Sequence, residues 1–281
     1  MLYSVNGDLV PAAEATVSVR DRGFMYGDAV FETMRAYDGA VFRFDAHLDR
    51  LANSCSLLGI DHDLPDAVFR ERVRETLSAN DLTEAYVKLS VSRGVQPGKL
   101  DPGPATDPTV VVQVSELDRG PAWDTPATLE TSPVQRIPDD AIPAAAKTHN
   151  YLNGILARAE LEADADEALM CDLEGEIAEG AASNLWFVRD GDLYTPTTDG
   201  PVLPGITRAL VLELAHEAGL AVHEGSYEPA AVRDAEEAFL TNRTWELRPI
   251  ATLDGHEIGG GPVTERLSRR YDERVERVCY D

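Results

Sequence analysis

The stretch from Lys147 to Phe187 reads KTHNYLNGILARAELEADADEALMCDLEGEIAEGAASNLWF, and its first residue is the most informative in the chain. Lys147 is one of three lysines, with Lys88 and Lys99, whereas arginine supplies the other 22 of the 25 basic residues. Lysine is normally a common residue. A lysine can lose its proton when buried and then attack a carbonyl, which arginine cannot do. The composition therefore favours a lysine retained for Schiff-base chemistry, above all with pyridoxal phosphate.

A second group in the same stretch suits that chemistry. Glu179 follows a strand-like segment and precedes a turn of small residues, Gly180–Ser183. A pyridine ring acts as an electron sink when its ring nitrogen is protonated, and a buried carboxylate can hold that proton. Taken alone, Lys147 would be a surface lysine and Glu179 an exposed turn residue. The prediction therefore depends on finding both in one chain.

Two further segments suit a phosphate group. The hexapeptide Leu203–Arg208, LPGITR, opens an amphipathic stretch over Ile206–Ala218. The N–H groups and the dipole at a helix start attract phosphate, and Thr207 adds a hydroxyl donor. Arg50, in the run HLDR, can supply the positive charge. The alternatives are an ordinary Pro-Gly turn and a solvated arginine.

The order of the elements predicts a mixed α and β chain in two parts. Residues 1–118 are expected to form a small α/β domain, residues 119–125 an interdomain linker, and residues 126–281 a larger domain. In the small domain the sequence predicts strands at 2–5, 9–10, 16–19, 28–37, 40–44, 85–93 and 109–114. Two helices are expected there, one beginning with Asp45 as its N-cap and one over 67–79. In the larger domain it predicts helices at 151–161, 206–218 and 263–278, with strands at 167–171, 176–178, 185–188, 193–194 and 237–240.

Composition narrows the class of function. The chain has 281 residues, a formal net charge of −25 and a sequence pI of about 4.5. Such a charge repels nucleic acid and anionic membrane surfaces. The histidines and cysteines show no metal-ligand spacing. The N-terminal segment lacks a signal-peptide pattern, and no apolar run is long enough to cross a bilayer. These features predict a soluble, cytoplasmic protein without a nucleic-acid partner, a membrane surface or a metal.

The acidic excess also predicts adaptation to a salt-rich cytoplasm, because dissolved salt screens the repulsion between like charges. On this halophilic interpretation, the purified protein should lose structure at low salt and regain it in concentrated KCl. A protein whose far-UV circular dichroism is indifferent to salt would contradict the hypothesis.

Together these motifs resemble the class IV aminotransferases, the fold-type IV pyridoxal-phosphate enzymes. The similarity extends over nearly the whole chain. It includes the order lysine, then E-x-x-x-x-N-L, then L-x-G-I-T-R, in the segments Arg22–Gly39, Phe44–Leu51, Lys147–Phe187, Leu203–Arg208 and Glu237–Ile250. The resemblance implies an α+β fold of two domains, like that of D-amino-acid aminotransferase. The small α/β domain is joined to a larger barrel-like, cofactor-binding domain, with pyridoxal 5'-phosphate in the cleft between them.

The resemblance also implies roles for individual residues. Lys147 forms the Schiff base and moves the proton, and Glu179 pairs with the pyridine nitrogen. Arg50, Thr207 and the backbone N–H of Ile206 hold the phosphate, and Tyr151 reaches the phenolic oxygen. A further phosphate contact is expected near Thr241–Thr244. The position that matches the family's threonine is Arg243, so Thr244 is the candidate in its place.

The branches of the family differ in how they hold the substrate. Val95–Leu100 lacks the R-x-H of the D-amino-acid branch. Tyr86-Val87-Lys88 keeps the tyrosine of the branched-chain Y-x-R but replaces its arginine by lysine, and Thr33 stands where those enzymes usually have glycine. Lys88 also suits aminodeoxychorismate lyase, whose substrate is dianionic. Alternatively, Lys88 is a charge at a strand edge.

We therefore predict transamination between an L-amino acid, branched-chain or glutamate, and a 2-oxo acid. The alternative is 4-amino-4-deoxychorismate lyase, which produces p-aminobenzoate and pyruvate. Tyr26, Thr33, Tyr86 and Lys88 are the candidate substrate contacts. Family members usually pair so that a small-domain loop closes the neighbour's site, so the resemblance implies a homodimer. A protein on the same scaffold that binds the cofactor without catalysis is the remaining alternative.

Overall fold

The computed structural model describes residues 1–105, 107–162 and 164–280. The chain folds into two compact units. Unit 1 comprises residues 1–120, 146–150 and 277–281, and unit 2 comprises residues 121–145 and 151–276. The two-domain boundaries expected from the sequence stay a prediction. One feature was not expected: the segment that carries Lys147 belongs to unit 1, although it lies between two parts of unit 2 in the sequence.

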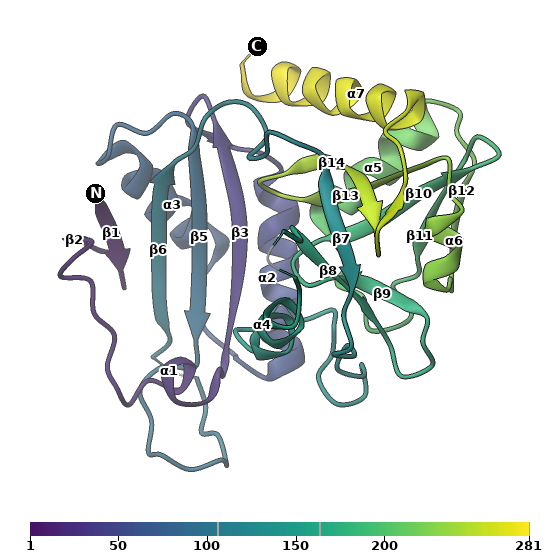
Figure 1. Cartoon of the computed structure of the whole chain (residues 1–281). Coiled ribbons are helices and arrows are strands. Elements are labelled where there is room, and N and C mark those ends of the chain that lie inside the picture. The colour runs from purple at the N-terminus through teal and green to yellow at the C-terminus, as the bar shows by residue number, and fades with distance from the viewer. Residues whose placement is uncertain (106, 163, 281) are drawn as a thin grey trace. The chain divides into compact units, whose positions relative to one another are not determined.

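The described part of unit 1 contains an antiparallel six-stranded sheet in the order β2-β1-β6-β5-β3-β4. Figure 1 shows its central strands side by side, with two helices behind them. The strands are β1 (Leu2–Val5), β2 (Asp8–Pro11), β3 (Ala29–Tyr37), β4 (Ala40–Val41), β5 (Ala85–Ser92) and β6 (Thr109–Glu116). The helices are α1 (Arg22–Tyr26), α2 (Phe44–Leu58) and α3 (Asp66–Ser78).

Alternation along the strands gives the sheet of unit 1 two faces with different roles. Val87, Leu89 and Val91 of β5 point to one face and are fully buried against the leucines and phenylalanine of α2 and α3. Each fully buried aliphatic side chain contributes about 1.5–3 kcal/mol to folding. The residues between them, Lys88 and Ser90, point to the opposite face and are only partly buried. The apolar core therefore lies on the helix side, and the other face carries polar groups.

The structure corrects two local expectations in unit 1. Residues 16–19 do not form a strand, because their alternating valines have nothing to pack against: Val17 and Val19 are exposed. Residues 40–44 do not form one long strand either, since β4 ends at Val41 and α2 begins at Phe44. The N-cap of α2 is Arg43, in a left-handed conformation, and Asp45 lies in the first turn instead. There its charge still complements the helix dipole.

Unit 2 contains a nine-stranded sheet among the described residues, in the order β12-β11-β10-β13-β14-β7-β8-β9, with β15 paired to β14. Strand β9, at one end, also contacts β10 and β11 near the other end, so the sheet curls in the barrel-like manner expected. The strands are β7 (Ala127–Thr131), β8 (Glu167–Cys171), β9 (Ile177–Gly180), β10 (Asn184–Arg189), β11 (Asp192–Pro196), β12 (Val222–Gly225), β13 (Glu237–Asn242), β14 (Glu246–Leu253) and β15 (His256–Glu257). The helices are α4 (Leu152–Ala159), α5 (Ile206–Glu217), α6 (Pro229–Arg233) and α7 (Pro262–Cys279), of which residues 277–279 are counted in unit 1.

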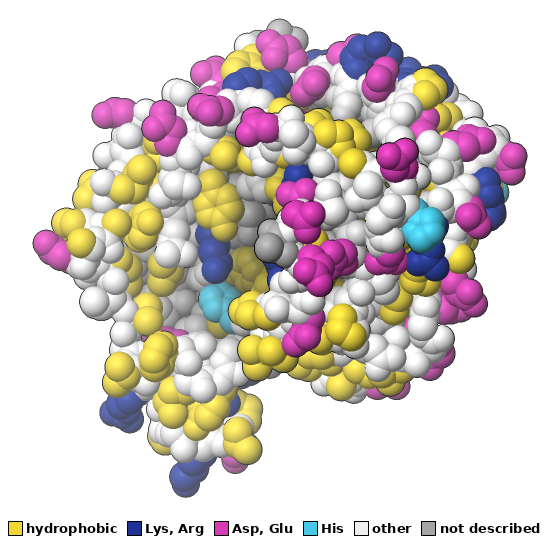
Figure 2. Space-filling view, in the orientation of Figure 1, with side chains coloured by type: hydrophobic (Ala, Val, Ile, Leu, Met, Phe, Trp, Pro, Cys, Tyr) yellow, Lys and Arg dark blue, Asp and Glu magenta, His cyan; other side chains and the backbone are white. Residues whose placement is uncertain are grey.

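The surface reflects the composition. Figure 2 shows acidic side chains spread over the visible face, with fewer lysines and arginines among them. Within the described residues, no helix combines the length and the apolar character that crossing a membrane requires.

Candidate active site

The backbone of Lys147 is held by the sheet of unit 1. The Phe31 N–H donates to the Lys147 carbonyl at 2.9 Å, and the His149 N–H donates to the Ala29 carbonyl at 2.8 Å. Residues 147–149 thus pair antiparallel with β3, with Val30 opposite Thr148. The Lys147 N–H donates to the Ser54 hydroxyl of α2 at 3.0 Å. A lysine anchored this way has a fixed backbone, so only its side chain retains freedom.

Two of the three lysines lie over one aromatic ring. Lys147 Nζ and Lys88 Nζ are each 4.7 Å from the centroid of the Phe31 ring. Burial lowers the pKa of Lys88 from its ordinary value, and the charge of Lys147 lowers it further. Thr33 lies directly opposite Lys88 across the β3–β5 pair, on the same face of the sheet. The structure therefore brings together three candidate site residues: Lys147, Lys88 and Thr33.

His149, which the sequence analysis did not select, lies on this face as well. Its ring meets the Phe31 ring edge-to-face, with centroids 5.3 Å apart, and its Nε2 is 3.3 Å from the Ser90 hydroxyl. Burial and the charge of Lys88 lower the pKa of His149 from 6.5 to about 4. This imidazole is therefore neutral at neutral pH. The one feature of the sequence that points to His149 is its position two residues after Lys147, because residues two apart along an extended segment face the same side.

Arg50 has a buried partner. Its guanidinium contacts the carboxylate of Glu32 at 2.7 and 2.8 Å, and Glu32 lies on β3 facing the helices. The remaining unit 1 candidates are less enclosed. Tyr86 is partly buried on the face that carries Lys88. Tyr26 of α1 is partly exposed, and the Arg22 guanidinium lies 5.0 Å from its ring centroid.

In unit 2, Glu179 is buried on β9 and paired on both oxygens. Arg136 contacts Oε1 at 2.8 and 3.0 Å. The Asn184 amide donates to Oε2 at 3.3 Å, and the Leu203 N–H donates to it at 3.1 Å. Arg136 was missed by the sequence analysis. It stands in a loop with no periodicity, where an arginine ordinarily indicates solvated surface.

Asn184 connects Glu179 to the LPGITR segment. Its amide also donates to the Leu203 carbonyl at 3.0 Å. A Cβ at Gly205 would lie 2.0 Å from the Asn184 Oδ1, so a larger residue before α5 would require the Asn184 side chain to move. The Asn184 side chain thus joins β9 to the segment before α5. These contacts also give a physical reason for the glycine of the motif.

The start of α5 has the features of an anion site. Ile206 and Thr207 occupy its first turn, which contains no acidic residue, and Thr207 is buried. Tyr151 precedes the first residue of α4 and is partly buried. Thr244 lies in a turn whose N–H groups donate to the Asn242 side chain, and its hydroxyl is 3.3 Å from the same oxygen. Its role as a phosphate contact stays a prediction, as do the roles of the other site residues.

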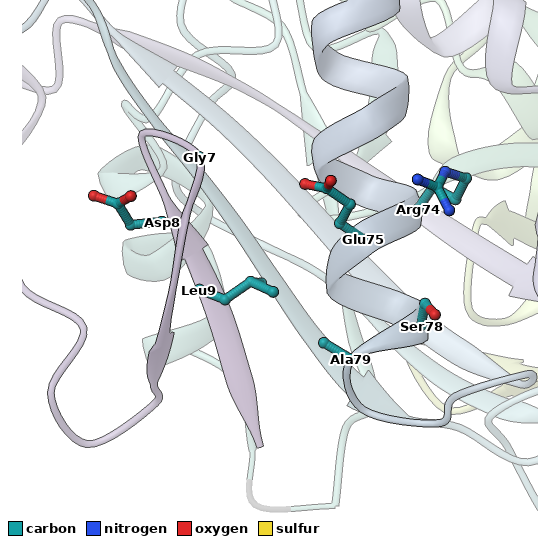
Figure 3. Close-up of a pocket in the computed structure, with 7 residues that line it drawn as sticks. All are labelled: Gly7, Asp8, Leu9, Arg74, Glu75, Ser78 and Ala79. Atoms are coloured by element: carbon teal, nitrogen blue, oxygen red, sulfur yellow. The ribbon is translucent and has the colours of Figure 1, made fainter.

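A surface cavity of about 390 Å³ lies elsewhere in unit 1. Figure 3 shows the turn between β1 and β2 on one side of it and α3 on the other. None of the candidate site residues lines it. Its one lining arginine, Arg74, pairs with Glu71, and no lysine lines the cavity. This cavity therefore does not provide the chemistry that the motifs predict. The described residues also contain no cluster of side chains suited to a metal ion.

Comparisons with known proteins agree with this architecture. A family model described as amino-transferase class IV matches residues 29–253. A putative branched-chain-amino-acid aminotransferase of Methanocaldococcus jannaschii is 38% identical over 97% of this chain and 96% of its own. The chain thus belongs to the class IV aminotransferase family, with the two-domain α+β fold expected from the sequence.

Two solved structures extend the comparison. The branched-chain amino acid aminotransferase of T.th., solved with pyridoxamine 5'-phosphate, is 34% identical with a TM-score of 0.91, covering 98% of this chain and 93% of that one. The 4-amino-4-deoxychorismate lyase of Pseudomonas aeruginosa is 30% identical with a TM-score of 0.85, covering 99% of this chain and 100% of that one. The fold is therefore shared by a transaminase and by a lyase.

This family uses pyridoxal 5'-phosphate, and the residues present fit it. The cofactor supplies an aldehyde for a primary amine and a pyridine ring that withdraws electrons from the substrate. Unit 1 provides the amine of Lys147 and the buried guanidinium of Arg50. Unit 2 provides the buried carboxylate of Glu179 and a helix start without acidic residues. The enzyme is thus a pyridoxal-phosphate-dependent aminotransferase by family.

Proposed function

We propose that this enzyme transfers an amino group from an L-amino acid, branched-chain or glutamate, to a 2-oxo acid. The observation that carries the proposal is the common location of Lys147 and Lys88, both within 4.7 Å of the Phe31 ring centroid. Transamination requires an amine that moves a proton and a cation that binds a carboxylate, and the two lysines provide these groups on one face of the sheet. The branched-chain relatives support this assignment.

Each site residue has a proposed task. Lys147 Nζ would remove the proton from the substrate's α-carbon and deliver it to the carbon of the cofactor's aldehyde group. Glu179 holds the proton on the pyridine nitrogen. Arg50, Thr207 and the N–H of Ile206 hold the phosphate, with Thr244 as a further contact, and Tyr151 donates to the phenolic oxygen. Lys88, Tyr86, Thr33 and Tyr26 line the substrate side, where Lys88 binds a carboxylate.

The test is the visible absorbance of the purified holoenzyme in concentrated KCl. L-leucine or L-glutamate should convert the bound cofactor to its amine form, with loss of the visible band, and 2-oxoglutarate should restore the band. D-alanine serves as the stereochemical control and should leave the band unchanged. A band that persists with both L-amino acids would overturn this proposal.

One observation favours a second function, 4-amino-4-deoxychorismate lyase. Lysine replaces the arginine of the branched-chain motif at position 88, and Thr33 lies opposite it across the strand pair, in place of the usual glycine. A lysine ammonium and a hydroxyl suit a dianionic substrate. The lyase breaks the ether C–O bond and removes a ring proton, and the enolpyruvyl group leaves and takes up a proton to become pyruvate.

The lyase is tested by mixing the holoenzyme with 4-amino-4-deoxychorismate. The fluorescence of p-aminobenzoate and the release of pyruvate should rise in equal amounts. With Lys88→Met, product formation should fall about tenfold or more, because a charge-assisted contact to the substrate is lost. Absence of both products, together with conversion by L-leucine, would exclude the lyase and leave the transaminase.

We further propose that the enzyme is a homodimer, as its family resemblance implies. The loop between β5 and β6 exposes Leu100 at 82%, and α1 exposes Phe24 at 68%. Exposed apolar residues of α1 and of this loop lie near one another in unit 1, since Gly98 lies against Met25 and Tyr26. An exposed apolar patch of this kind is typical of a contact surface, whereas a single exposed leucine is not. Light scattering in concentrated KCl should give the dimer mass. Leu100→Asp should weaken the dimer, whereas Leu173→Asp, at a residue exposed in a turn of unit 2, should not. The cytoplasmic location stays a prediction.

A further inference from the structure

Strand β3 separates two groups of charged residues by its alternation. Phe31 and Thr33 face the side that carries Lys147 and Lys88, whereas Glu32 between them faces α2 and is 0% exposed. A carboxylate here is unexpected, because its neighbours on this face, Val30 and Met34, belong to the apolar core. A charged group in such a place must have partners, since burying an isolated charge is very costly.

The partners of Glu32 both come from α2. Arg50 contacts it at 2.8 Å through Nε and at 2.7 Å through Nη2, one contact to each carboxylate oxygen. His47 Nδ1 lies 2.6 Å from Oε2, and the His47 side chain is almost fully buried. Bidentate pairing fixes both the position and the plane of a guanidinium. Glu32 therefore determines where the Arg50 head group lies.

The stability of the fold is a poor explanation for the buried charges of Glu32, Arg50 and His47. Replacing a buried ion pair by well-packed apolar residues is often neutral or even stabilising, because desolvation offsets the attraction between the charges. Arg50 stands in a helix whose neighbouring inward residues, Leu48 and Leu51, are buried leucines. An apolar side chain could complete this packing. The charged pair thus indicates a requirement for a fixed guanidinium at this point.

The same strand also fixes Lys147. Phe31, the residue before Glu32, donates its N–H to the Lys147 carbonyl. A second connection runs through Ser54, whose hydroxyl donates to the Arg50 carbonyl at 2.8 Å and accepts from the Lys147 N–H at 3.0 Å. Adjacent residues of one strand therefore hold the Schiff-base lysine and the arginine. This sets the distance between the backbone of Lys147 and the guanidinium of Arg50.

We propose that Glu32 is a positioning residue for the cofactor phosphate: it holds Arg50 in register with Lys147. The proposal rests on the phosphate role proposed for Arg50 and is independent of which substrate the enzyme uses. Glu32 itself touches neither cofactor nor substrate. Its removal should therefore weaken the recognition of the phosphate and leave the recognition of the aldehyde and the ring nearly unchanged.

The experiment compares two ligands that differ only in the phosphate. Apoenzyme is titrated with pyridoxal 5'-phosphate and with pyridoxal, and the visible band reports binding of each. In Glu32→Gln the Kd for pyridoxal 5'-phosphate should rise about tenfold or more, the loss expected for a charge-assisted contact. The Kd for pyridoxal should change by less than about threefold. Arg50→Ala should show the same pattern, and adding Glu32→Gln to Arg50→Ala should have no further effect on the ratio of the two Kd values.

A matched control comes from another buried glutamate. Glu237 accepts hydrogen bonds from the N–H groups of Val263 and Thr264 at the start of α7, so it has a structural task in unit 2. Glu237→Gln should lower the thermal stability without changing the ratio of Kd values. If Glu32→Gln weakens both ligands by the same factor, or weakens neither, the proposal is wrong.

Two further measurements keep the outcome decisive. Glu32→Asp retains the charge, so it serves if Glu32→Gln does not fold, and it should shift the ratio in the same direction by a smaller factor. An unchanged ratio in Glu32→Asp together with an unfolded Glu32→Gln would reduce Glu32 to a structural role. A ratio unchanged in Arg50→Ala would overturn the phosphate role of Arg50 itself. Neither result depends on turnover, so the proposed transamination is tested separately.

Discussion

Each of the two units contains a candidate site residue that forms an ion pair with a residue of opposite charge, and the signs are reversed between the units. In unit 1 the guanidinium of Arg50, which we propose binds the phosphate, pairs with the buried carboxylate of Glu32. In unit 2 the carboxylate of Glu179, which we propose pairs with the pyridine nitrogen, is held by the guanidinium of Arg136. The settings differ: Glu32 is fully buried, whereas Arg136 remains partly exposed. The comparison indicates that each charged group proposed to contact the cofactor is paired with an opposite charge, and that this partner is more deeply buried in unit 1 than in unit 2.

The largest effect should come from replacing Lys147, whose amine we propose forms the Schiff base. Lys147→Ala should abolish turnover and the visible absorbance of the bound cofactor, because no other group in its place can form the Schiff base. The measurements are steady-state kinetics and the absorbance spectrum of the reconstituted protein. Lys99→Ala, at the lysine in the loop of residues 94–108, is the control and should retain both. Activity within tenfold of the parent in Lys147→Ala would refute the assignment.

The ion pair of unit 2 is broken by Arg136→Met. Without the guanidinium, the carboxylate of Glu179 binds a proton more readily, so its hold on the pyridine nitrogen should weaken. We expect turnover to fall about tenfold and the pH dependence of the visible band to shift. Arg136→Lys keeps a positive charge and should recover part of the loss. If Arg136→Met behaves like the parent in both readouts, the parallel between the two units fails.

A substitution at Gly205 tests the packing that joins Glu179 to α5. The added Cβ of Gly205→Ala would lie 2.0 Å from the Asn184 Oδ1, so Asn184 must move. Overpacking of this kind costs about 1–3 kcal/mol of unfolding free energy. Gly200→Ala is the matched control, since no atom lies within 4 Å of its added Cβ. Denaturant unfolding should show a loss at Gly205 only, and equal stability of the two variants would contradict the prediction.

The smallest effect concerns the protonation of His149 in unit 1. Its pKa in the folded protein is about 4, below the ordinary 6.5, because of burial first and the charge of Lys88 second. The neutral form is favoured by folding, so its contribution to stability is present above pH 6.5 and is lost as the pH falls through this range to about 4. Nuclear magnetic resonance of the imidazole protons should show titration near pH 4. Lys88→Met should raise this pKa. A titration near 6.5 in the parent would show that the ring is solvated.

Much of the architecture follows from local patterns. The alternation of β5 and the helical periodicity of α2, α3 and α5 predicted these elements to within a few residues. Four of the described strands were not predicted: β7, β12, β14 and β15. β12 and β15 have no buried residue, and β7 pairs in parallel with β8 and β14, which lie far away in the sequence. β14 is eight residues long and largely buried, but it contains Pro249, which a sequence pattern counts against a strand. Residues 16–19 show the opposite error, because a strand was predicted there and none forms. An alternating pattern forms a strand only where a neighbouring strand pairs with it and its apolar side chains have a surface to pack against.

The amino-acid sequence by itself determined the family and the cofactor, because Lys147, Glu179 and the LPGITR segment occur as specific residue types in a fixed order. The roles of the individual site residues are proposals that the same order suggests. Only the tertiary structure decided what holds these residues. The pairing of Lys147 with β3, the contact of Arg50 with Glu32 and that of Glu179 with Arg136 join residues from 18 to 116 positions apart. No local propensity encodes such contacts, since they form only when separate elements pack together and the buried charges must find their partners.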